Sequence, residues 1–594
     1  MTKLVTLDLS TFWFLDLPAK LEKPNLVMLV QNLTRLKILY LDGVNISANG
    51  KEWSQALASS LPNLQVLSMS YCYLSGPIDP SLAKLKSLSV IRLDGNNLSA
   101  PFPKFFAEFQ TLTSLHLSET GLSGRLPEEI LQVPTLQTLD LSFNYLLEGS
   151  FPKFPPNASL QTLVLSYTNF GGELLESIGN LGQLRRIELT KCKFNGPIPE
   201  TIEKLRQLIY LDFSQNNFSG PIPSFTSLRN LSELHLADNQ LTSSILSTNW
   251  SSLLNLVTLD LRHNSFSGAV SPTLFRSPSL KRVDLSKNQF TGGFSEVSGE
   301  FSLELKVLDL SHNKLQGPFP MSVFEIQGLT FLSLSWNNFS GLIPLTAFQK
   351  LRELSFLDLS YNNFFVDSSA SVPYFTNITR LKLASCNLTK FPDFVKNQSK
   401  LTHLDLSNNQ IYGEIPNWIW KPKLQYLNLS LNFLVQFKGP LHIPSYLSVI
   451  DFRGNQLQGQ IPIFPPQAIY LDYSNNNFSS VLPPEIGNYL QFATFFSISG
   501  FSLGWFSKTE ITEGELIGVG EEGSSNNEKE QGISERIFRY FLRCIFLFLV
   551  FVSTSDSTGV ILLLGSACIN EKPVPARYRL ASSRCHQKSP APLD

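Results

Sequence analysis

Histidine, aspartate and cysteine are the side chains in this sequence that could bind a metal or transfer protons. The seven histidines are spread along the whole chain, and none has a carboxylate or cysteine at the spacing of a zinc site. No nucleotide-binding loop, kinase motif or nucleophile–base pair is recognisable. We therefore expect no enzymatic activity, no metal centre and no cofactor. The histidines are His116, His235, His263, His312, His403, His442 and His586.

Aspartate recurs at one position of a repeated frame. A line of carboxylates along a sheet could bind cations or basic peptides, but we interpret it as the solvated consensus of an exposed strand. Nine repeats carry it, at Asp140, Asp212, Asp260, Asp284, Asp309, Asp358, Asp405, Asp451 and Asp472.

Six cysteines occur, and three of them occupy another position of the same frame. We interpret Cys72, Cys192 and Cys386 as small buried residues, because they lie too many repeats apart to form disulfides with one another. Cys544, Cys568 and Cys585 follow the last repeat.

The frame itself is L-x-x-L-x-L-x-x followed by a ninth residue that is most often asparagine, and it returns every 21 to 28 residues. Self-similarity at this period is typical of a leucine-rich solenoid. The ninth positions are Val44, Cys72, Asn96, Thr120, Asn144, Thr168, Cys192, Asn216, Asn239, Asn264, Asn288, Asn313, Asn337, Asn362, Cys386, Asn409, Asn432, Asn455 and Asn476.

The segment 208–223 illustrates one repeat. Leu208, Leu211 and Phe213 hold positions 1, 4 and 6, so the period of two predicts a short strand with one buried face. Asp212 and Ser214 are then expected to face solvent. The position-9 asparagine is expected to bond the loops of its own coil and of the next coil.

A single repeat cannot bury its apolar edge alone, so stacking of coils is required. We predict an α/β-type repeat solenoid over residues 1–500, a curved horseshoe or superhelix. One long parallel sheet should line its concave face, and the convex side should be mostly 3-10 or irregular. About twenty strands at roughly 4.8 Å make a surface on the order of 95 Å long, which suits macromolecular ligands.

The amino-acid composition limits the classes of molecule that the chain could bind. The net charge of −1 does not favour nucleic acid or an anionic membrane. Thirteen N-x-S/T sequons favour a secreted glycoprotein, although six of them arise from the repeat consensus itself. They are Asn32, Asn45, Asn97, Asn157, Asn217, Asn230, Asn249, Asn338, Asn377, Asn387, Asn397, Asn428 and Asn477.

Several segments resemble a known family. G-x-[IL]-P follows the ladder at 124–127, 196–199, 220–223, 341–344, 413–416 and 459–462, as in plant-type extracellular leucine-rich repeats. The segments 39–57, 63–88 and 478–490 resemble the Verticillium wilt resistance receptor-like proteins. The resemblance covers roughly residues 1–500.

The resemblance implies a plasma-membrane immune receptor without its own kinase. Such a receptor perceives a microbial or endogenous protein or peptide outside the cell and signals through receptor-kinase co-receptors. The sequence departs from the family at both ends, since no signal peptide, no cysteine cap and no clear anchor is recognised. A secreted inhibitor of microbial cell-wall hydrolases and a non-functional truncated gene product remain as alternatives.

The repeat frame ends near residue 500, where Phe501 replaces the next ladder asparagine. We expect 501–594 to form a divergent tail, disordered over 509–531 and 566–594, with an apolar segment over 537–564. The uninterrupted stretch between Arg543 and Asp556 has 12 residues, whereas a span needs roughly 20. It is interpreted either as a weak membrane helix or as an apolar tail from a retained intron or shifted frame.

The candidate ligand-binding residues are those that break the repeat consensus on the concave face. A mixed-charge patch is expected between repeats 184 and 282, with two further cations downstream. A glycan on Asn428, at position 5, would direct ligand docking to the earlier repeats or a lateral edge. The candidates are Arg185, Arg186, Glu188, Tyr210, Glu233, His235, Arg262, Lys281, Arg282, Arg380 and Lys382.

Overall fold

The computed structural model divides into two compact units, Met1–Ser507 and Lys508–Asp594. It describes residues 3–11, 19–156, 158–293, 302, 304–343, 345–366, 377–438, 443–444, 446–463, 465, 467–479, 486, 490–498, 551–554 and 557–560. In the second unit, β37 (Phe551–Thr554) pairs antiparallel with β38 (Ser557–Val560).

Most expectations for the tail fall outside the described residues. These are the disorder over 509–531 and 566–594, the three tail cysteines, and the apolar segment 537–564 apart from the two strands just named. Among the described residues, no helix combines the length and the apolar composition that a bilayer crossing requires.

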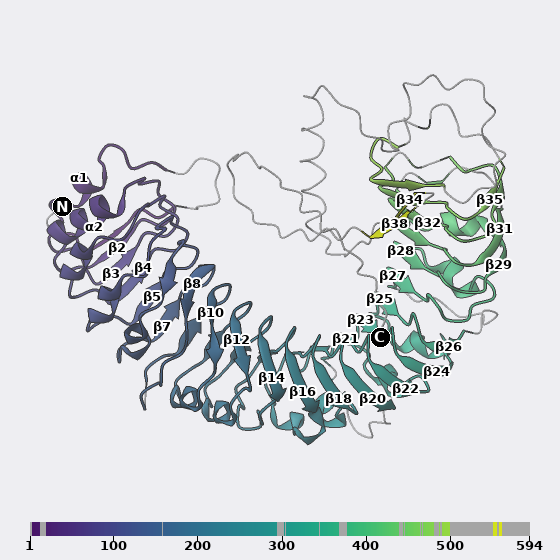
Figure 1. Cartoon of the computed structure of the whole chain (residues 1–594), viewed down its shortest axis with the longest axis horizontal. Helices are drawn as coiled ribbons and strands as arrows, with labels where there is room; N and C mark the ends of the chain where they lie inside the picture. The colour runs from purple at the N-terminus through teal and green to yellow at the C-terminus, as the bar shows by residue number, and fades with distance from the viewer. Residues whose placement is uncertain are drawn as a thin grey trace, which may run out of the picture. The chain divides into compact units, whose positions relative to one another are not determined.

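A 21-stranded parallel sheet dominates the first unit, with one short strand from each coil (Figure 1). Successive strands pair in register, as in Tyr210↔Glu233 and Leu211↔Leu234. The predicted long parallel sheet is therefore confirmed. Its strands are β1 (Thr6–Asp8), β2 (Ile38–Tyr40), β3 (Val66–Ser68), β4 (Val90–Arg92), β5 (Ser114–His116), β7 (Thr138–Asp140), β9 (Thr162–Val164), β11 (Arg186–Glu188), β13 (Tyr210–Asp212), β15 (Glu233–His235), β17 (Thr258–Asp260), β19 (Arg282–Asp284), β21 (Val307–Asp309), β23 (Phe331–Ser333), β25 (Phe356–Asp358), β27 (Arg380–Lys382), β28 (His403–Asp405), β30 (Tyr426–Asn428), β32 (Val449–Asp451), β34 (Tyr470–Asp472) and β36 (Phe495–Ser497).

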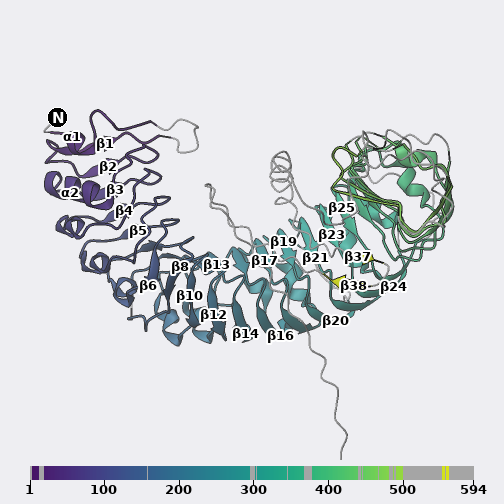
Figure 2. The ribbon, with the colours of Figure 1, turned by 45° about the horizontal axis from the view of Figure 1, so that its top comes forward.

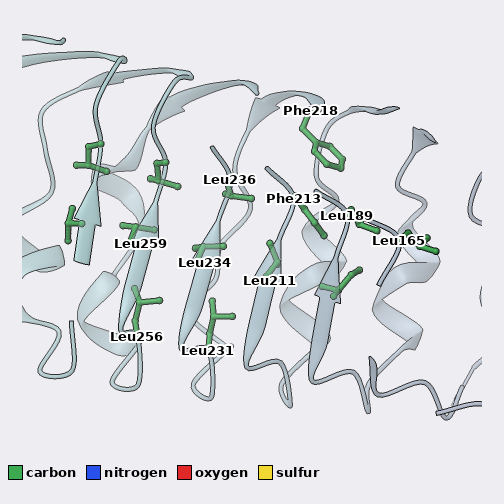
Figure 3. Packing of buried hydrophobic residues seen from close by; sticks show 14 of the residues in the cluster. Leu165, Leu189, Leu211, Phe213, Phe218, Leu231, Leu234, Leu236, Leu256 and Leu259 are labelled. Atoms are coloured by element: carbon green, nitrogen blue, oxygen red, sulfur yellow. The ribbon is translucent and has the colours of Figure 1, made fainter. Parts of the chain in front are cut away.

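The core consists of the apolar positions of the frame. Leu211, Phe213 and Phe218 are fully buried, and the equivalent residues of the neighbouring coils stack on them in rows (Figure 3). Phe194 and Phe218 stack with ring centroids 6.0 Å apart. Burial by neighbours rather than within one repeat is the reason that the coils form a continuous array.

The ladder asparagines connect adjacent coils. The Asn216 amide nitrogen donates to the carbonyl of Leu189 at 2.6 Å and to that of Phe213 at 3.1 Å, and its Oδ1 accepts from the Phe194 N–H at 3.1 Å. The prediction that the asparagine bonds two coils is confirmed. Its direction was wrong, because the second coil is the preceding one rather than the next.

A second parallel sheet runs beside the first, and the sequence analysis did not predict it. It forms where residues after the asparagine extend again, with Gly220 at φ +76° next to the last residue of such a strand. Figure 2 shows this row, including β14 and β16, separate from the row of β17 and β19. Its strands are β6 (Ser123–Arg125), β8 (Leu146–Gly149), β10 (Asn169–Glu173), β12 (Lys193–Gly196), β14 (Asn217–Pro221), β16 (Gln240–Ser244), β18 (Ser265–Gly268), β20 (Gln289–Gly293), β22 (Lys314–Gly317), β24 (Asn338–Leu342) and β26 (Asn363–Phe365).

The remaining side of each coil is built mainly from 3-10 turns, as expected. Typical examples are η2 (Lys104–Glu108), η3 (Glu128–Gln132) and η5 (Glu200–Lys204). The first coils differ and carry two α-helices, α1 (Leu26–Val30) and α2 (Gly50–Ser60). Two short pairs continue the second row further on, namely β29 (Tyr412–Ile415) with β31 (Phe433–Phe437) and β33 (Gln458–Gly459) with β35 (Asn477–Phe478).

Candidate functional site

Most of the predicted charged residues form a contiguous surface on β11, β13, β15, β17 and β19. In-register pairing aligns Arg186, Tyr210, Glu233, Thr258 and Arg282 in one row across the five strands. Arg185 and Lys281 immediately precede their strands, and Arg262 follows β17. We call these predicted residues from 185 to 282 the central charged patch.

The first part of the central charged patch is built around Tyr210. The guanidinium of Arg186 lies 4.0 Å from the centre of the Tyr210 ring and pairs with Glu188. On the other side, the His235 ring centroid is 5.6 Å from that of Tyr210, and His235 Nε2 is 3.3 Å from Glu233 Oε2. Burial, followed by the charge of Asp212, raises the pKa of Tyr210 to about 12, so this phenol stays neutral.

Arg262 lies among three carboxylates in the second part of the patch. Its Nη1 is 3.0 Å from Asp260 Oδ2 and 3.9 Å from Asp284 Oδ2, and its Nη2 is 3.9 Å from Asp238 Oδ2. His263 Nδ1 lies 2.6 Å from Asp238 Oδ1. Since most charges already have a partner, the patch is preorganised.

Arg380 and Lys382 do not join the central charged patch. They lie on β27, which is separated from β19 by β21, β23 and β25. Lys382 Nζ is 3.8 Å from Asp358 Oδ2 and 5.7 Å from the centre of the Phe356 ring. The structure therefore separates the predicted site residues into two groups.

Five of the nine position-5 aspartates are buried and the other four are half-buried, which corrects the interpretation of this row as fully solvated. Asp284 is 4% exposed and Asp472 is 3% exposed, and Ser214, which was expected to face solvent, is 7% exposed. Each carboxylate accepts a hydrogen bond from the backbone N–H two residues later, which belongs to Arg262 for Asp260 and to Arg453 for Asp451. Where that residue is serine its hydroxyl can donate as well, as in Asp405, where the Ser407 N–H donates at 3.0 Å and the hydroxyl at 2.7 Å. The short repeat brings these carboxylates side by side, a consequence of stacking that one repeat cannot reveal.

Burial of this carboxylate row changes its acidity. The pKa of Asp309 is raised to about 6, first by burial and then by Asp284 on the adjacent strand. Burial also raises the pKa of Asp451 to about 6, and Asp472 and Asp405 add to the effect while Arg453 opposes it. Repulsion between neighbouring carboxylates is thus relieved by protonation as the pH falls.

Sequence reasoning missed the carboxylates that pair with Arg262 and the aromatic rings that stack beyond the patch. Asp238, Asp260 and Asp284 complete the central charged patch, because they neutralise Arg262. Aromatic rings stack between β21 and β25, and Trp336 and Tyr361 have centroids 4.0 Å apart. Aromatic residues recurring at the same position of consecutive repeats were the available signal.

The groups considered for metal or covalent chemistry are dispersed. Cys72 and Cys386 are buried free thiols, as expected, and Cys192 is half-buried. In the described part of the chain no three His, Cys, Asp or Glu side chains gather into a potential metal site.

A cleft of about 130 Å³ between η2 and η3, lined by Phe109, Gln132 and Pro134, is smaller than a typical ligand pocket of roughly 300 Å³ or more.

The sequons differ in accessibility. Asn217 and Asn338 are exposed at the start of β14 and β24, and Asn387 is exposed directly after Cys386, whereas Asn157 lies outside the described residues. Asn428 is half-buried and replaces aspartate in the carboxylate row, where its Oδ1 accepts from the Ser430 N–H at 3.0 Å and hydroxyl at 2.7 Å. Occupancy of Asn428 by a glycan stays a hypothesis.

The repeat geometry agrees with family profiles. The Leucine Rich Repeat profile matches residues 63–85, 159–181, 207–228, 255–277, 400–422 and 467–489, and a related profile with the same description matches 304–364. The chain is a leucine-rich repeat protein.

Its curated relatives are plant receptor-like proteins. Receptor-like protein 47 of Arabidopsis thaliana is 40% identical over 129 residues, which cover 21% of this chain and 16% of that protein. Receptor-like protein 6 of the same plant is 37% identical over 118 residues, 19% of this chain and 12% of that protein. The chain is therefore related to the plant leucine-rich repeat receptor-like proteins, and it matches well under two thirds of the length of these relatives.

Solved receptor ectodomains share the fold. The HAESA ectodomain of Arabidopsis, in complex with the IDA peptide hormone, superposes with a TM-score of 0.66 at 27% identity, covering 82% of this chain and 81% of that one. The GASSHO1/SCHENGEN3 ectodomain of Arabidopsis thaliana, in complex with CASPARIAN STRIP INTEGRITY FACTOR 2, gives 0.64 at 28% identity, covering 84% and 62%. Both likenesses span most of the repeat unit.

Proposed function

We propose that this chain is the ligand-binding part of a plant cell-surface receptor-like protein that recognises a microbial or endogenous protein or peptide in defence signalling. The observation that carries the proposal is the long parallel sheet, which presents surface side chains from consecutive coils in continuous rows. Its relatives are receptor-like proteins, and two similar ectodomains are solved with peptide or protein ligands.

The central charged patch is the proposed docking surface for that ligand. Its arginines are already held by Glu188, Asp260 and Asp284, so their orientation before binding requires little additional ordering. Arg185 and Lys281 are exposed at two ends of the patch and can approach carboxylates of a ligand. Arg380 and Lys382 form a second proposed contact farther along the sheet.

Signalling is proposed to depend on partner receptor kinases, with the chain held at the plasma membrane or secreted beside it as a glycoprotein. We infer no catalytic role for the chain itself. A binding surface is sufficient for this function, because a ligand that contacts both this chain and a co-receptor kinase brings the two proteins together.

Transfer of residues 180–290 into a related full-length receptor-like protein tests the proposal. We expect the chimera to acquire the response of this chain's full-length receptor to plant-derived or microbial extracts. Charge reversal by Arg185→Glu with Lys281→Glu should abolish that response, whereas Lys193→Glu, at an exposed position on strand β12 of the second sheet, should leave it intact. A chimera whose recognition is unchanged would refute the role of the central charged patch.

A further inference from the structure

Two rows of aromatic side chains run across β21, β23 and β25, outside the central charged patch. In the first row, Phe331 and Phe356 stack with centroids 4.2 Å apart and an angle of 8° between the rings. In the second row, the Trp336 ring lies between His312 at 5.3 Å and Tyr361 at 4.0 Å. We call these five residues the aromatic rows.

Small side chains separate the aromatic rows. Ser333, Ser335 and Ser360 are each 4% exposed, whereas Trp336 is 48% exposed. Ser333 pairs in register with Asp309 of β21 and with Asp358 of β25. Asp309 is half-buried, and Asp358 is 8% exposed and lies 3.8 Å from Lys382 Nζ. A buried strip of hydroxyl-bearing residues between protruding rings gives an extended chain room to lie along the solenoid.

The second row belongs to the same face as the first. Burial, followed by the charges of Asp405 and Asp358, raises the pKa of Tyr361, whose side chain also hydrogen-bonds that of Ser407. Asp405 and Asp358 end strands of the 21-stranded sheet, and Ser407 follows one of them. Asp358 also acts on His312, where it opposes the lowering of the pKa by burial and by Lys287. The rings of both rows therefore border one surface.

Stacking determines whether a ligand would meet the faces or the edges of these rings. The two faces of Trp336 are covered by His312 and Tyr361, one face of Phe331 and one face of Phe356 cover each other, and Lys382 Nζ lies 5.7 Å from the centre of the Phe356 ring. Ring edges are electropositive, whereas sugars bind preferentially to ring faces. The aromatic rows thus favour acceptor-rich groups, such as peptide carbonyls and carboxylates, over a pyranose.

Cations lie at opposite ends of the aromatic rows. Lys287 precedes His312 in the second row and is close enough to lower the pKa of that histidine, after burial as the larger cause. Arg380 follows Phe356 in register at the end of the first row. The coils of Lys287 and Arg380 are four strand steps apart, which is about 19 Å along the solenoid. An extended peptide of about six residues has this length.

We propose that the aromatic rows bind an extended acidic polypeptide segment, in which an apolar or aromatic side chain lies between two carboxylates about six residues apart. The carboxylates meet Lys287 and Arg380, backbone carbonyls between them meet the ring edges, and the apolar side chain lies over the serine strip between the two rows. The inference rests on the proposed ligand-binding function and specifies the chemistry of the ligand and a second contact area for it.

Selection from a phage-displayed random dodecapeptide library on the purified full chain tests the inference. We expect enriched peptides to carry an aromatic, proline or aliphatic residue between acidic residues. A synthetic copy of the most enriched peptide should bind at least ten-fold more weakly to the Trp336→Ser, Phe331→Ser double variant and to Lys287→Glu. Tyr412→Ser is the matched control, since Tyr412 is 58% exposed on β29, away from the aromatic rows.

Circular dichroism and thermal unfolding must match between variants, and Lys287→Glu provides a test that leaves every ring in place. Enrichment of basic peptides, failure to enrich any sequence, or equal binding by all variants would overturn the inference. Binding of chitohexaose or a hexagalacturonide that is lost in the double variant would instead assign the rows to a glycan. The chimera described above reports on receptor function separately, because it responds or fails regardless of the library result.

Discussion

Replacing Asp309 by asparagine should make the coil around β21 more stable at neutral pH. The pKa of Asp309 is raised from 3.8 to about 6, by burial first and by Asp284 second. Because the folded state binds this proton more tightly than the unfolded chain, the group favours folding at low pH. That advantage is lost as the pH rises through about 6.

The magnitude follows from the shift. A displacement of about two pKa units corresponds to about 3 kcal/mol of destabilisation once the carboxylate is ionised, which is an upper bound for the local gain in Asp309→Asn above pH 7. Below about pH 4 the gain should vanish. Asparagine fits this row, because Asn428 accepts the same two hydrogen bonds from Ser430 that Asp405 accepts from Ser407.

Hydrogen–deuterium exchange is the appropriate assay, since stability in a repeat array is local. After correction for intrinsic exchange rates, amides of β19 and β21 should be better protected in Asp309→Asn than in the wild type at pH 7.5, with about a third of that free-energy difference left at pH 4.5. Asp140→Asn is the control, because its in-register neighbours are His116 and Val164 rather than carboxylates. An equal gain at both pH values, or none at pH 7.5, would refute the reasoning.

Three other outcomes are expected. Asn288→Ala should destabilise the coil of Asn288 and the preceding coil by about 2–4 kcal/mol, because several buried backbone groups lose their hydrogen-bond partner. The control, Asn217→Ala, should change stability by less than about 0.5 kcal/mol in the same exchange assay. Arg262→Met should lower unfolding temperature more at pH 8 than at pH 5, since two buried carboxylates lose their cation; an effect independent of pH would contradict that role. Glycopeptide mass spectrometry of secreted protein should find Asn217 modified and Asn428 unmodified, because the Asn428 amide is half-buried within the carboxylate row; a glycan on Asn428 would show that this row opens or forms late.

The candidate site illustrates the limit of reading one repeat at a time. Arg186, Tyr210 and His235 were recognised because they depart from the consensus of the frame, and the structure brings them into contact. Asp260 was dismissed because it belongs to that consensus, yet it is the nearest carboxylate to Arg262. Residues that depart from the repeat consensus are easy to recognise in the sequence, but the residue that pairs with one of them can itself be a consensus residue.

The amino-acid pattern by itself determined the solenoid, since the spacing of Leu208, Leu211 and Phe213 leaves stacking as the only way to bury them. It also determined the two-coil role of the ladder asparagines. The tertiary structure alone decided the direction of those bonds, the second parallel sheet and the burial of the carboxylate row. These features depend on contacts between adjacent coils, whose strands lie about 4.8 Å apart. The side chains that make these contacts are more than twenty residues apart in sequence, so the sequence of one repeat does not show them.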